Sequence, residues 1–135
     1  MKLLILNGPN LNLLGLREPD IYGSRSYAAL EAFIRETCRE KQIECEIFQS
    51  NHEGALVDKI QEAYGVFDGI VINPAAYTHT SVAIPAVEVH LSDVRAREPF
   101  RQISYAGMAC VKTYMGLGFD GYREAIRFLK AYLQK

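Results

Sequence analysis

Two side chains suited to acid–base chemistry lie close together in the apolar run 86–90. Because side chains alternate along an extended strand, Glu88 and His90 face the same side. A carboxylate beside an imidazole fixes the tautomer of the ring, which suits a general acid–base pair. A core histidine with satisfied nitrogens would show the same pattern. The place of His90 at the carboxyl end of a strand favours the catalytic interpretation.

The segment 7–23 carries polar groups of another kind, namely Asn12, Arg17 and Tyr22. It has seventeen residues, whereas about 2–6 usually join a strand to a helix. Its length and position favour a lid over a mobile surface loop. A guanidinium near Tyr22 would favour the phenolate, although lowering a pKa of ~10 by ~3 units requires about 4 kcal/mol. Taken alone, such a tyrosine is more often a packing residue.

Hydroxyl, amide and basic side chains follow two further apolar runs. Asn73 and the polar run 78–81, which includes His79, come after the first, and Ser92 comes after the second. Backbone N–H groups at the start of a following helix would make this cluster an anion pocket, but its hydroxyls would equally cap that helix. Arg101 ends a charged run that is usually solvent-exposed, although its rigid fork also suits a carboxylate ligand.

The sequence gives little support to a metal site or a bound cofactor. His52, His79 and His90 have no short ligand spacing, and no cysteine accompanies them. The glycine-rich dinucleotide and phosphate-binding loops are absent, and so is the nucleophile elbow of hydrolases. The expected chemistry therefore uses no metal and no cofactor.

The elements that position these residues follow from hydrophobic periodicity. Strands are predicted at 2–7, 44–49, 69–73 and 86–90, with a less regular fifth at 109–115. Helices are predicted at about 26–41, with Ser26 as N-cap, and at about 120–133. A further helix is predicted between the second and third strands, with one face formed by Leu56, Val57, Ile60 and Tyr64. This alternation indicates an α/β fold, a flavodoxin-like three-layer sandwich with a five-stranded parallel sheet. Ligands of such sheets bind beyond the carboxyl ends of the strands, where the polar residues above cluster.

The bulk composition is that of one ordinary globular domain spanning 1–135. Fifteen basic and sixteen acidic residues give a net charge of -1, which argues against nucleic-acid and membrane partners. The opening apolar run is too short for a signal peptide or a membrane helix. Cys38, Cys45 and Cys110 are odd in number and lack CxxC spacing, so they are expected to be buried thiols of a cytoplasmic protein.

Four motifs in this order resemble those of type II 3-dehydroquinate dehydratases, over nearly the whole chain. They are 6–12 with 17–19 and 22–23, then 49–54, then 73–81, then 88–92 with 96–101. The resemblance implies a flavodoxin-like domain assembled as a homododecamer built from trimers. It also implies the reaction of the shikimate or quinate pathway in which 3-dehydroquinate loses water and gives 3-dehydroshikimate.

The resemblance further implies a role for each site residue. Tyr22 would remove the proton alpha to the ketone, with Arg17 stabilising its phenolate, and Asn12 would hold a water that stabilises the enolate. His90, oriented by Glu88, would protonate the leaving hydroxyl. The residues expected to bind the substrate are Asn73, His79, Leu91 through its backbone, Ser92 and Arg101.

The chain departs from the family pattern between Ser81 and Ile84. Family members continue there with a helix of roughly ten further residues, about three turns, and Ala86 takes the place of an aspartate that reaches a neighbouring subunit. Either the natural chain has residues that this sequence lacks, or the helix is truly shortened, in which case trimer contacts and full activity would suffer.

Two other functions remain compatible with these residues. One is a different acid–base lyase or isomerase acting on another hydroxylated keto acid. The other is a flavodoxin-like module whose polar loops only hold an anion, an interpretation that draws on the short segment after Ser81.

Overall fold

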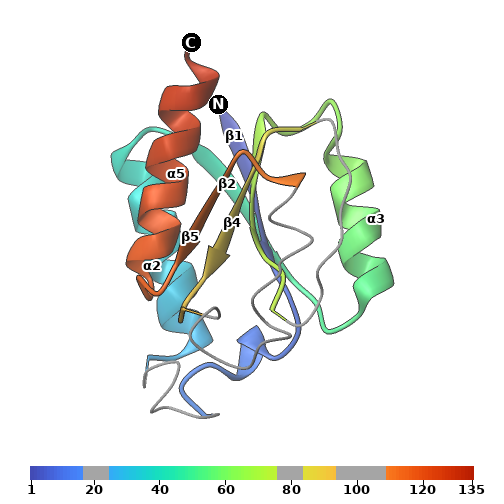
Figure 1. The fold of residues 1–135 in the computed structure, drawn as a ribbon, viewed down its shortest axis with the longest axis vertical. Coiled ribbons are helices and arrows are strands. Elements are labelled where there is room, and N and C mark those ends of the chain that lie inside the picture. The colour runs from blue at the N-terminus through green and yellow to red at the C-terminus, as the bar shows by residue number, and fades with distance from the viewer. Residues whose placement is uncertain (17–24, 76–83, 94–108) are drawn as a thin grey trace.

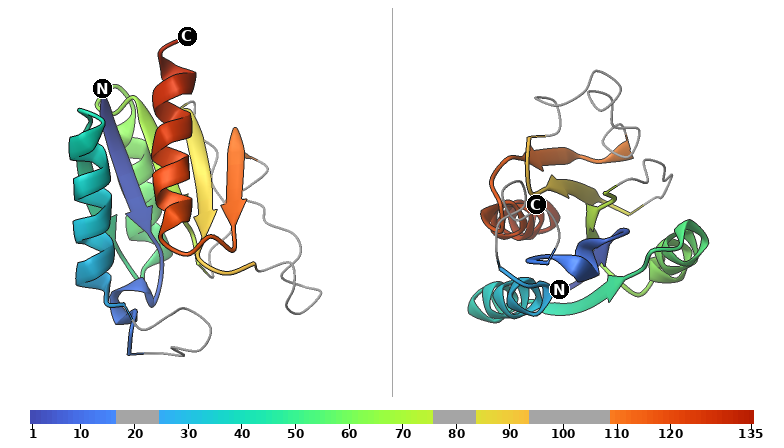
Figure 2. Two further views of the ribbon diagram at one scale, coloured as in Figure 1. Left: turned by 90° about the vertical axis from the view of Figure 1, so that its left-hand side faces the viewer. Right: turned by 90° about the horizontal axis from the view of Figure 1, so that it is seen from below.

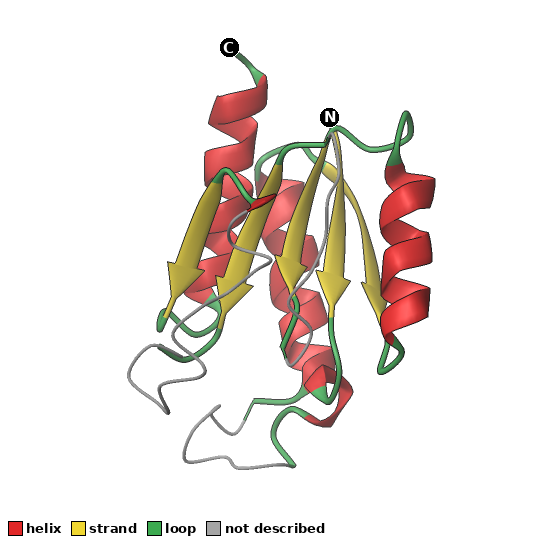
Figure 3. Ribbon diagram, turned by 45° about the vertical axis from the view of Figure 1, so that its right-hand side comes forward, coloured by secondary structure: helices red, strands yellow, loops and turns green. Residues whose placement is uncertain are grey.

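The computed structural model describes residues 1–16, 25–75, 84–93 and 109–135 (Figure 1). Five strands in these ranges form one parallel sheet in the order β2-β1-β3-β4-β5. They are β1 (Lys2–Asn7), β2 (Glu44–Gln49), β3 (Gly69–Asn73), β4 (Ala86–His90) and β5 (Lys112–Met115). This order is the flavodoxin-like one, which confirms the predicted fold. All five strands point toward the same edge of the sheet (Figure 3).

Helices cover both faces of the sheet. The structure describes α2 (Tyr27–Glu40), α3 (Glu53–Ala63), α5 (Asp120–Leu133) and the short 3-10 helix η1 (Leu11–Leu13). Helices α2 and α5 lie together on one face and α3 lies on the other (Figures 1 and 2). The three-layer sandwich follows from this arrangement, as the alternation of strand and helix predicted.

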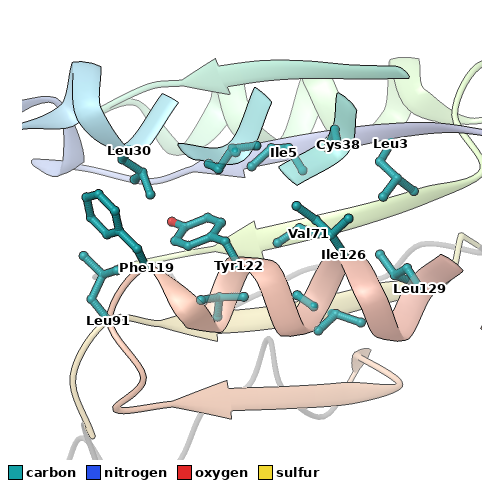
Figure 4. Packing of buried hydrophobic residues seen from close by; sticks show 14 of the residues in the cluster. Leu3, Ile5, Leu30, Cys38, Val71, Leu91, Phe119, Tyr122, Ile126 and Leu129 are labelled. Carbon is teal, nitrogen blue, oxygen red and sulfur yellow. The ribbon is translucent and has the colours of Figure 1, made fainter. Parts of the chain in front are cut away.

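Strand β1 supplies both halves of the core because its side chains alternate between the two faces. Leu3 and Ile5 are buried in the cluster beneath α2 and α5, whereas Leu4 and Leu6 are buried in the cluster beneath α3. Figure 4 shows the first cluster, with Tyr122 pointing from α5 into the layer between helix and sheet. The near-continuous apolar run in β1 is thus the signature of a strand buried on both sides.

The predicted N-cap of α2 and the predicted apolar face of α5 are both confirmed. The Ser26 hydroxyl accepts a hydrogen bond from the backbone N–H of Ala29, 3.1 Å away, and so caps α2 as expected. In α5 the expected apolar face is buried, with Tyr122, Ile126 and Leu129 fully enclosed. The described residues contain no helix that is both long and apolar enough to span a membrane.

Three sequence-based predictions were wrong in detail. Tyr64, expected on the buried face of α3, is 71% exposed because the helix ends at Ala63 and Tyr64 adopts an extended backbone before Gly65, whose φ is +75°. Strand β5 begins at Lys112 rather than at residue 109. Cys45 and Cys110 are partly exposed rather than buried; Cys45 lies on the edge strand β2, which is only partly covered.

Candidate active site

Polar side chains meet where the parallel strands end. Asn7 closes β1 and lies opposite Gln49 of β2 on one side and Asn73 of β3 on the other. His90 closes β4, the next strand along the sheet. The topology therefore gathers at one edge groups that are distant in the sequence, as the switch-point rule for such sheets predicts.

Glu88 and His90 form a buried acid–base pair at this edge. His90 Nε2 lies 3.0 Å from Glu88 Oε1, and the exposed fractions of the two residues are 8% and 0%. His90 Nε2 makes no hydrogen bond of good geometry in this contact, which lies within ion-pair distance and becomes an attraction between charges only when the ring is protonated. Thr113, the partner of Glu88 in the β4–β5 register, donates its hydroxyl to Glu88 Oε2 at 3.2 Å. Glu88 is thereby held in place from the neighbouring strand.

The thiol of Cys110 responds to the same buried charge. Burial, and after it the negative charge of Glu88, raise the pKa of Cys110 to about 12. Both effects disfavour the thiolate because they penalise a second negative charge in a poorly solvated place.

Asn12 is held at the edge by Gln49. The Gln49 side-chain nitrogen Nε2 lies 3.3 Å from Asn12 Oδ1, 3.0 Å from Asn51 Oδ1 and 3.2 Å from the backbone oxygen of Gly8. Two N–H groups are shared among these three acceptors. Asn51 Oδ1 also accepts the backbone N–H of Asn10 at 2.9 Å. The amide nitrogen of Asn12 is therefore the end of its side chain that faces away from Gln49.

A second network lies buried beneath the edge. The Tyr122 hydroxyl of α5 donates to Asn7 Oδ1 at 2.7 Å and accepts from Asn73 Nδ2 at 3.0 Å. Asn7 Nδ2 in turn donates to the Tyr27 hydroxyl at 3.3 Å. Burial raises the pKa of Tyr122. Burial also raises the pKa of Tyr27, and this effect outweighs the lowering by the hydrogen bond from Asn7. Both phenols therefore stay neutral and act as hydrogen-bonding groups.

The backbone of the first loop passes very close to the end of β3. The Gly8 N–H donates to the Asn73 carbonyl at 2.8 Å. A Cβ at Gly8 would lie 2.4 Å from the Pro74 carbonyl oxygen, well inside contact distance. Glycine at position 8 is thus required by this close approach.

The structure places some of the expected site residues together and leaves others undescribed. Asn12, Asn73, Glu88, His90, Leu91 and Ser92 all lie at the carboxyl edge of the sheet. The Leu91 carbonyl accepts the backbone N–H of Gly118 at 3.0 Å, which fixes the backbone just after β4. Arg17, Tyr22, His79 and Arg101 lie outside the described residues.

Four residues of the site were not singled out from the sequence: Asn7, Gln49, Thr113 and Tyr122. Gln49 could have been found, since it begins the motif 49–54. Tyr122 was assigned only to the apolar face of its helix. The ranges that the structure describes contain no cluster of side chains able to hold a metal ion.

Comparison with known proteins gives consistent matches along the whole chain. The family model for dehydroquinase class II matches residues 1–130. A 3-dehydroquinate dehydratase of Geotalea daltonii is 49% identical, with both chains covered completely. A catabolic 3-dehydroquinase of Aspergillus terreus is 53% identical over 92% of this chain and 88% of the relative. The crystal structure of a type II dehydroquinase from Butyrivibrio crossotus superimposes with a TM-score of 0.90 at 50% identity, covering 96% and 97% of the two chains.

The same comparison bears on the length of the chain. The match with the Geotalea daltonii protein extends over 144 aligned positions, nine more than the 135 residues present here. This difference is close to the roughly ten residues by which the family pattern is expected to exceed this chain between Ser81 and Ile84.

Proposed function

The chain belongs to the class II dehydroquinase family, and we propose that the carboxyl edge of its sheet forms the active site together with the loop residues Arg17 and Tyr22. The reaction of the chain is the dehydration of 3-dehydroquinate. The observation that supports the site most directly is the Glu88–His90 pair, with its 3.0 Å contact at the end of β4. A histidine stabilised as an imidazolium by a buried carboxylate is a suitable proton donor to a leaving hydroxyl.

The reaction divides into two proton transfers. In the first, the Tyr22 phenolate removes the proton alpha to the ketone, and the electron pair of that C–H bond forms an enolate. Arg17 stabilises the phenolate, and Asn12 holds a water that donates to the enolate oxygen. The amide nitrogen of Asn12 suits this role, since Gln49 engages the oxygen and leaves the nitrogen facing away from it. In the second, the enolate expels the beta-hydroxyl, which His90 protonates so that it leaves as water.

The remaining site residues hold the substrate. Asn73, at the end of β3, and Ser92, just after β4, offer an amide and a hydroxyl at the same edge as His90. Leu91 contributes its backbone, while His79 and Arg101 complete the set, with the guanidinium binding a hydroxyl or carboxylate. No step of this scheme requires a metal ion or an imine.

The test is direct. Purified protein treated with chelator and with borohydride is mixed with 3-dehydroquinate, and the ultraviolet absorbance of the conjugated enone is followed. We expect turnover in both treatments. Tyr22→Phe and Arg17→Ala should each lower kcat at least ~100-fold, the scale of losing an acid–base group or a charge stabiliser.

A matched control separates the base from the other tyrosines. Tyr64→Phe removes the same atom from a side chain that lies just past the end of α3 and is 71% exposed, and it should leave kcat unchanged. A Tyr22→Phe enzyme with a normal rate would reject Tyr22 as the base, and loss of turnover on borohydride treatment would reject the enolate scheme in favour of an imine.

We also propose that the chain assembles as a homododecamer built from trimers and acts in the cytoplasm. The assembly is supported by the family resemblance, and the location by the free thiols Cys38, Cys45 and Cys110. Light scattering of the purified protein tests the assembly. A monomer would reject the proposed assembly.

A further inference from the structure

We infer that Tyr122 is a positioning residue for substrate binding, because its buried hydroxyl fixes the orientation of the Asn73 side-chain amide. The inference rests on the proposed role of Asn73 as a substrate ligand. Tyr122 comes from α5, whereas Asn73 closes β3, so a hydroxyl of this helix contacts a residue of the site.

The direction of each hydrogen bond follows from the chemistry of the groups. Asn7 Oδ1 is only an acceptor, so the Tyr122 hydroxyl, 2.7 Å away, must donate its single hydrogen there. The same hydroxyl can then only accept from Asn73, 3.0 Å away, which places the nitrogen of the Asn73 amide toward Tyr122. Asn73 Oδ1 accepts the backbone N–H of Ala75 at 3.2 Å, which requires the same orientation.

A reversed Asn73 amide would lose both interactions. Its oxygen would face the Tyr122 oxygen, whose hydrogen is already committed to Asn7, and its nitrogen would face the N–H of Ala75. One contact would then bring two oxygens together and the other would bring two N–H groups together. Asn73 is 3% exposed and Tyr122 is fully buried, so water cannot readily compensate.

The fixed orientation determines what Asn73 can offer a substrate. An amide nitrogen has two N–H groups, and Tyr122 takes one of them. None of the hydrogen bonds recorded among the described residues uses the second N–H, which we assign to an acceptor at the sheet edge, such as a hydroxyl or carboxylate oxygen of the substrate. Without the Tyr122 hydroxyl, the amide would lose the partner that holds its nitrogen in place.

A double-mutant cycle on steady-state kinetics tests this coupling. Tyr122→Phe keeps the ring and removes the hydroxyl, and we expect it to raise KM about 5-fold or more while kcat changes less. In the Asn73→Ala background, the same change should alter KM by less than about 2-fold, because the amide on which the hydroxyl acts is gone. A purely structural tyrosine would give equal effects in both backgrounds.

The same helix provides the control. Tyr132→Phe also removes a phenolic hydroxyl from α5, but Tyr132 is 40% exposed and stacks on Phe128 through its ring. It should leave KM and kcat unchanged. Equal, multiplying effects of Tyr122→Phe and Asn73→Ala would overturn the inference, as would an unchanged KM in Tyr122→Phe.

A measurement on the unsubstituted protein covers the case in which Tyr122→Phe fails to fold. Neutron diffraction from deuterated crystals should place a deuterium of Asn73 Nδ2 toward the Tyr122 oxygen and the Tyr122 deuterium toward Asn7. The opposite amide orientation would overturn the inference. This measurement needs no turnover, so it tests the inference independently of the proposed function. The proposed function would instead be rejected if the unsubstituted enzyme did not dehydrate 3-dehydroquinate.

Discussion

His90 Nε2 lies 3.0 Å from Glu88 Oε1, and both side chains project from the same face of β4 at the carboxyl edge of the sheet. Residues two apart on a strand share a face, so this pair could be anticipated. Its burial and the bracing of Glu88 by Thr113 could not, since they depend on β5. The pair is the described part of the site whose chemistry is easiest to isolate by mutation.

Replacing Glu88 by glutamine should lower kcat at least about 10-fold, because the variant keeps the shape of the side chain but removes the charge that stabilises a protonated His90. Steady-state rates with 3-dehydroquinate measure the effect, and urea unfolding monitors stability. Glu46→Gln is the matched control, since Glu46 lies on the partly exposed strand β2 and pairs with Lys59 of α3. The kcat of this variant should not change. If Glu88→Gln retained full kcat, the carboxylate would have only a packing role.

Gln49→Glu should lower kcat more than Gln49→Ala does. Alanine removes the donor that holds Asn12, a neutral hydrogen bond of about 1 kcal/mol, whereas glutamate places a negative acceptor against three acceptor oxygens. Kinetic assays at constant substrate saturation compare the two variants. Gln61→Glu, on the exposed side of α3, should behave like the unsubstituted enzyme. A Gln49→Glu enzyme as active as the parent would show that Gln49 does not hold Asn12 for catalysis.

Gly8→Ala should destabilise the protein by about 1–3 kcal/mol and reduce activity, because its Cβ would meet the Pro74 carbonyl oxygen at 2.4 Å and push the end of β3 away. Urea unfolding and the dehydration assay measure the two effects. The control is Gly54→Ala in α3, where nothing lies within 4 Å of the added atom, and which should be neutral or stabilising by up to about 1 kcal/mol. Equal stability of the two variants would contradict the close approach.

Alkylation should distinguish the cysteines by pH. The Cys38 hydrogen bond, with the charge of Arg35 in support, lowers the pKa of Cys45 against the effect of burial. Because the thiolate is the reactive form, alkylation of Cys45 should reach half its maximal rate below the ~8.5 of a free cysteine and rise with pH up to that point. Cys110, whose pKa burial raises to about 12, should stay unmodified at pH 8. Mass spectrometry of alkylated peptides assigns the sites, and faster modification of Cys110 would refute the prediction.

The elements of the fold could be predicted from the sequence wherever they depend on residues close together along the chain. The limits of β1, β3 and β4 agree with the apolar runs, and Ser26 caps α2 because its hydroxyl acts on a backbone only three residues away. Tyr64 was misplaced because helical periodicity continues past Ala63, whereas the extended backbone at Tyr64 and the positive φ of Gly65 end the helix. A period in the sequence does not show where the hydrogen bonds of a helix stop.

The site was only partly predictable for a related reason. Glu88 and His90 were found from alternation within one strand, but the network of Asn7, Asn73 and Tyr122 joins residues 49 and 115 positions apart. Partners at such separations are fixed by the packing of α5 on the sheet. Tyr122 therefore had the sequence pattern of an ordinary core residue, and only the structure assigns partners to its hydroxyl.

The hydroxyl of Tyr122 also imposes an order on biosynthesis. Tyr122 leaves the ribosome 115 residues after Asn7, on the order of ten seconds later at ordinary rates of translation. Once β3 has also been made, the amides at the ends of β1 and β3 still lack the phenol that completes their hydrogen bonds. Until α5 docks, these amides must take their hydrogen bonds from water, so the network at the carboxyl edge is completed only when the last helix packs on the sheet.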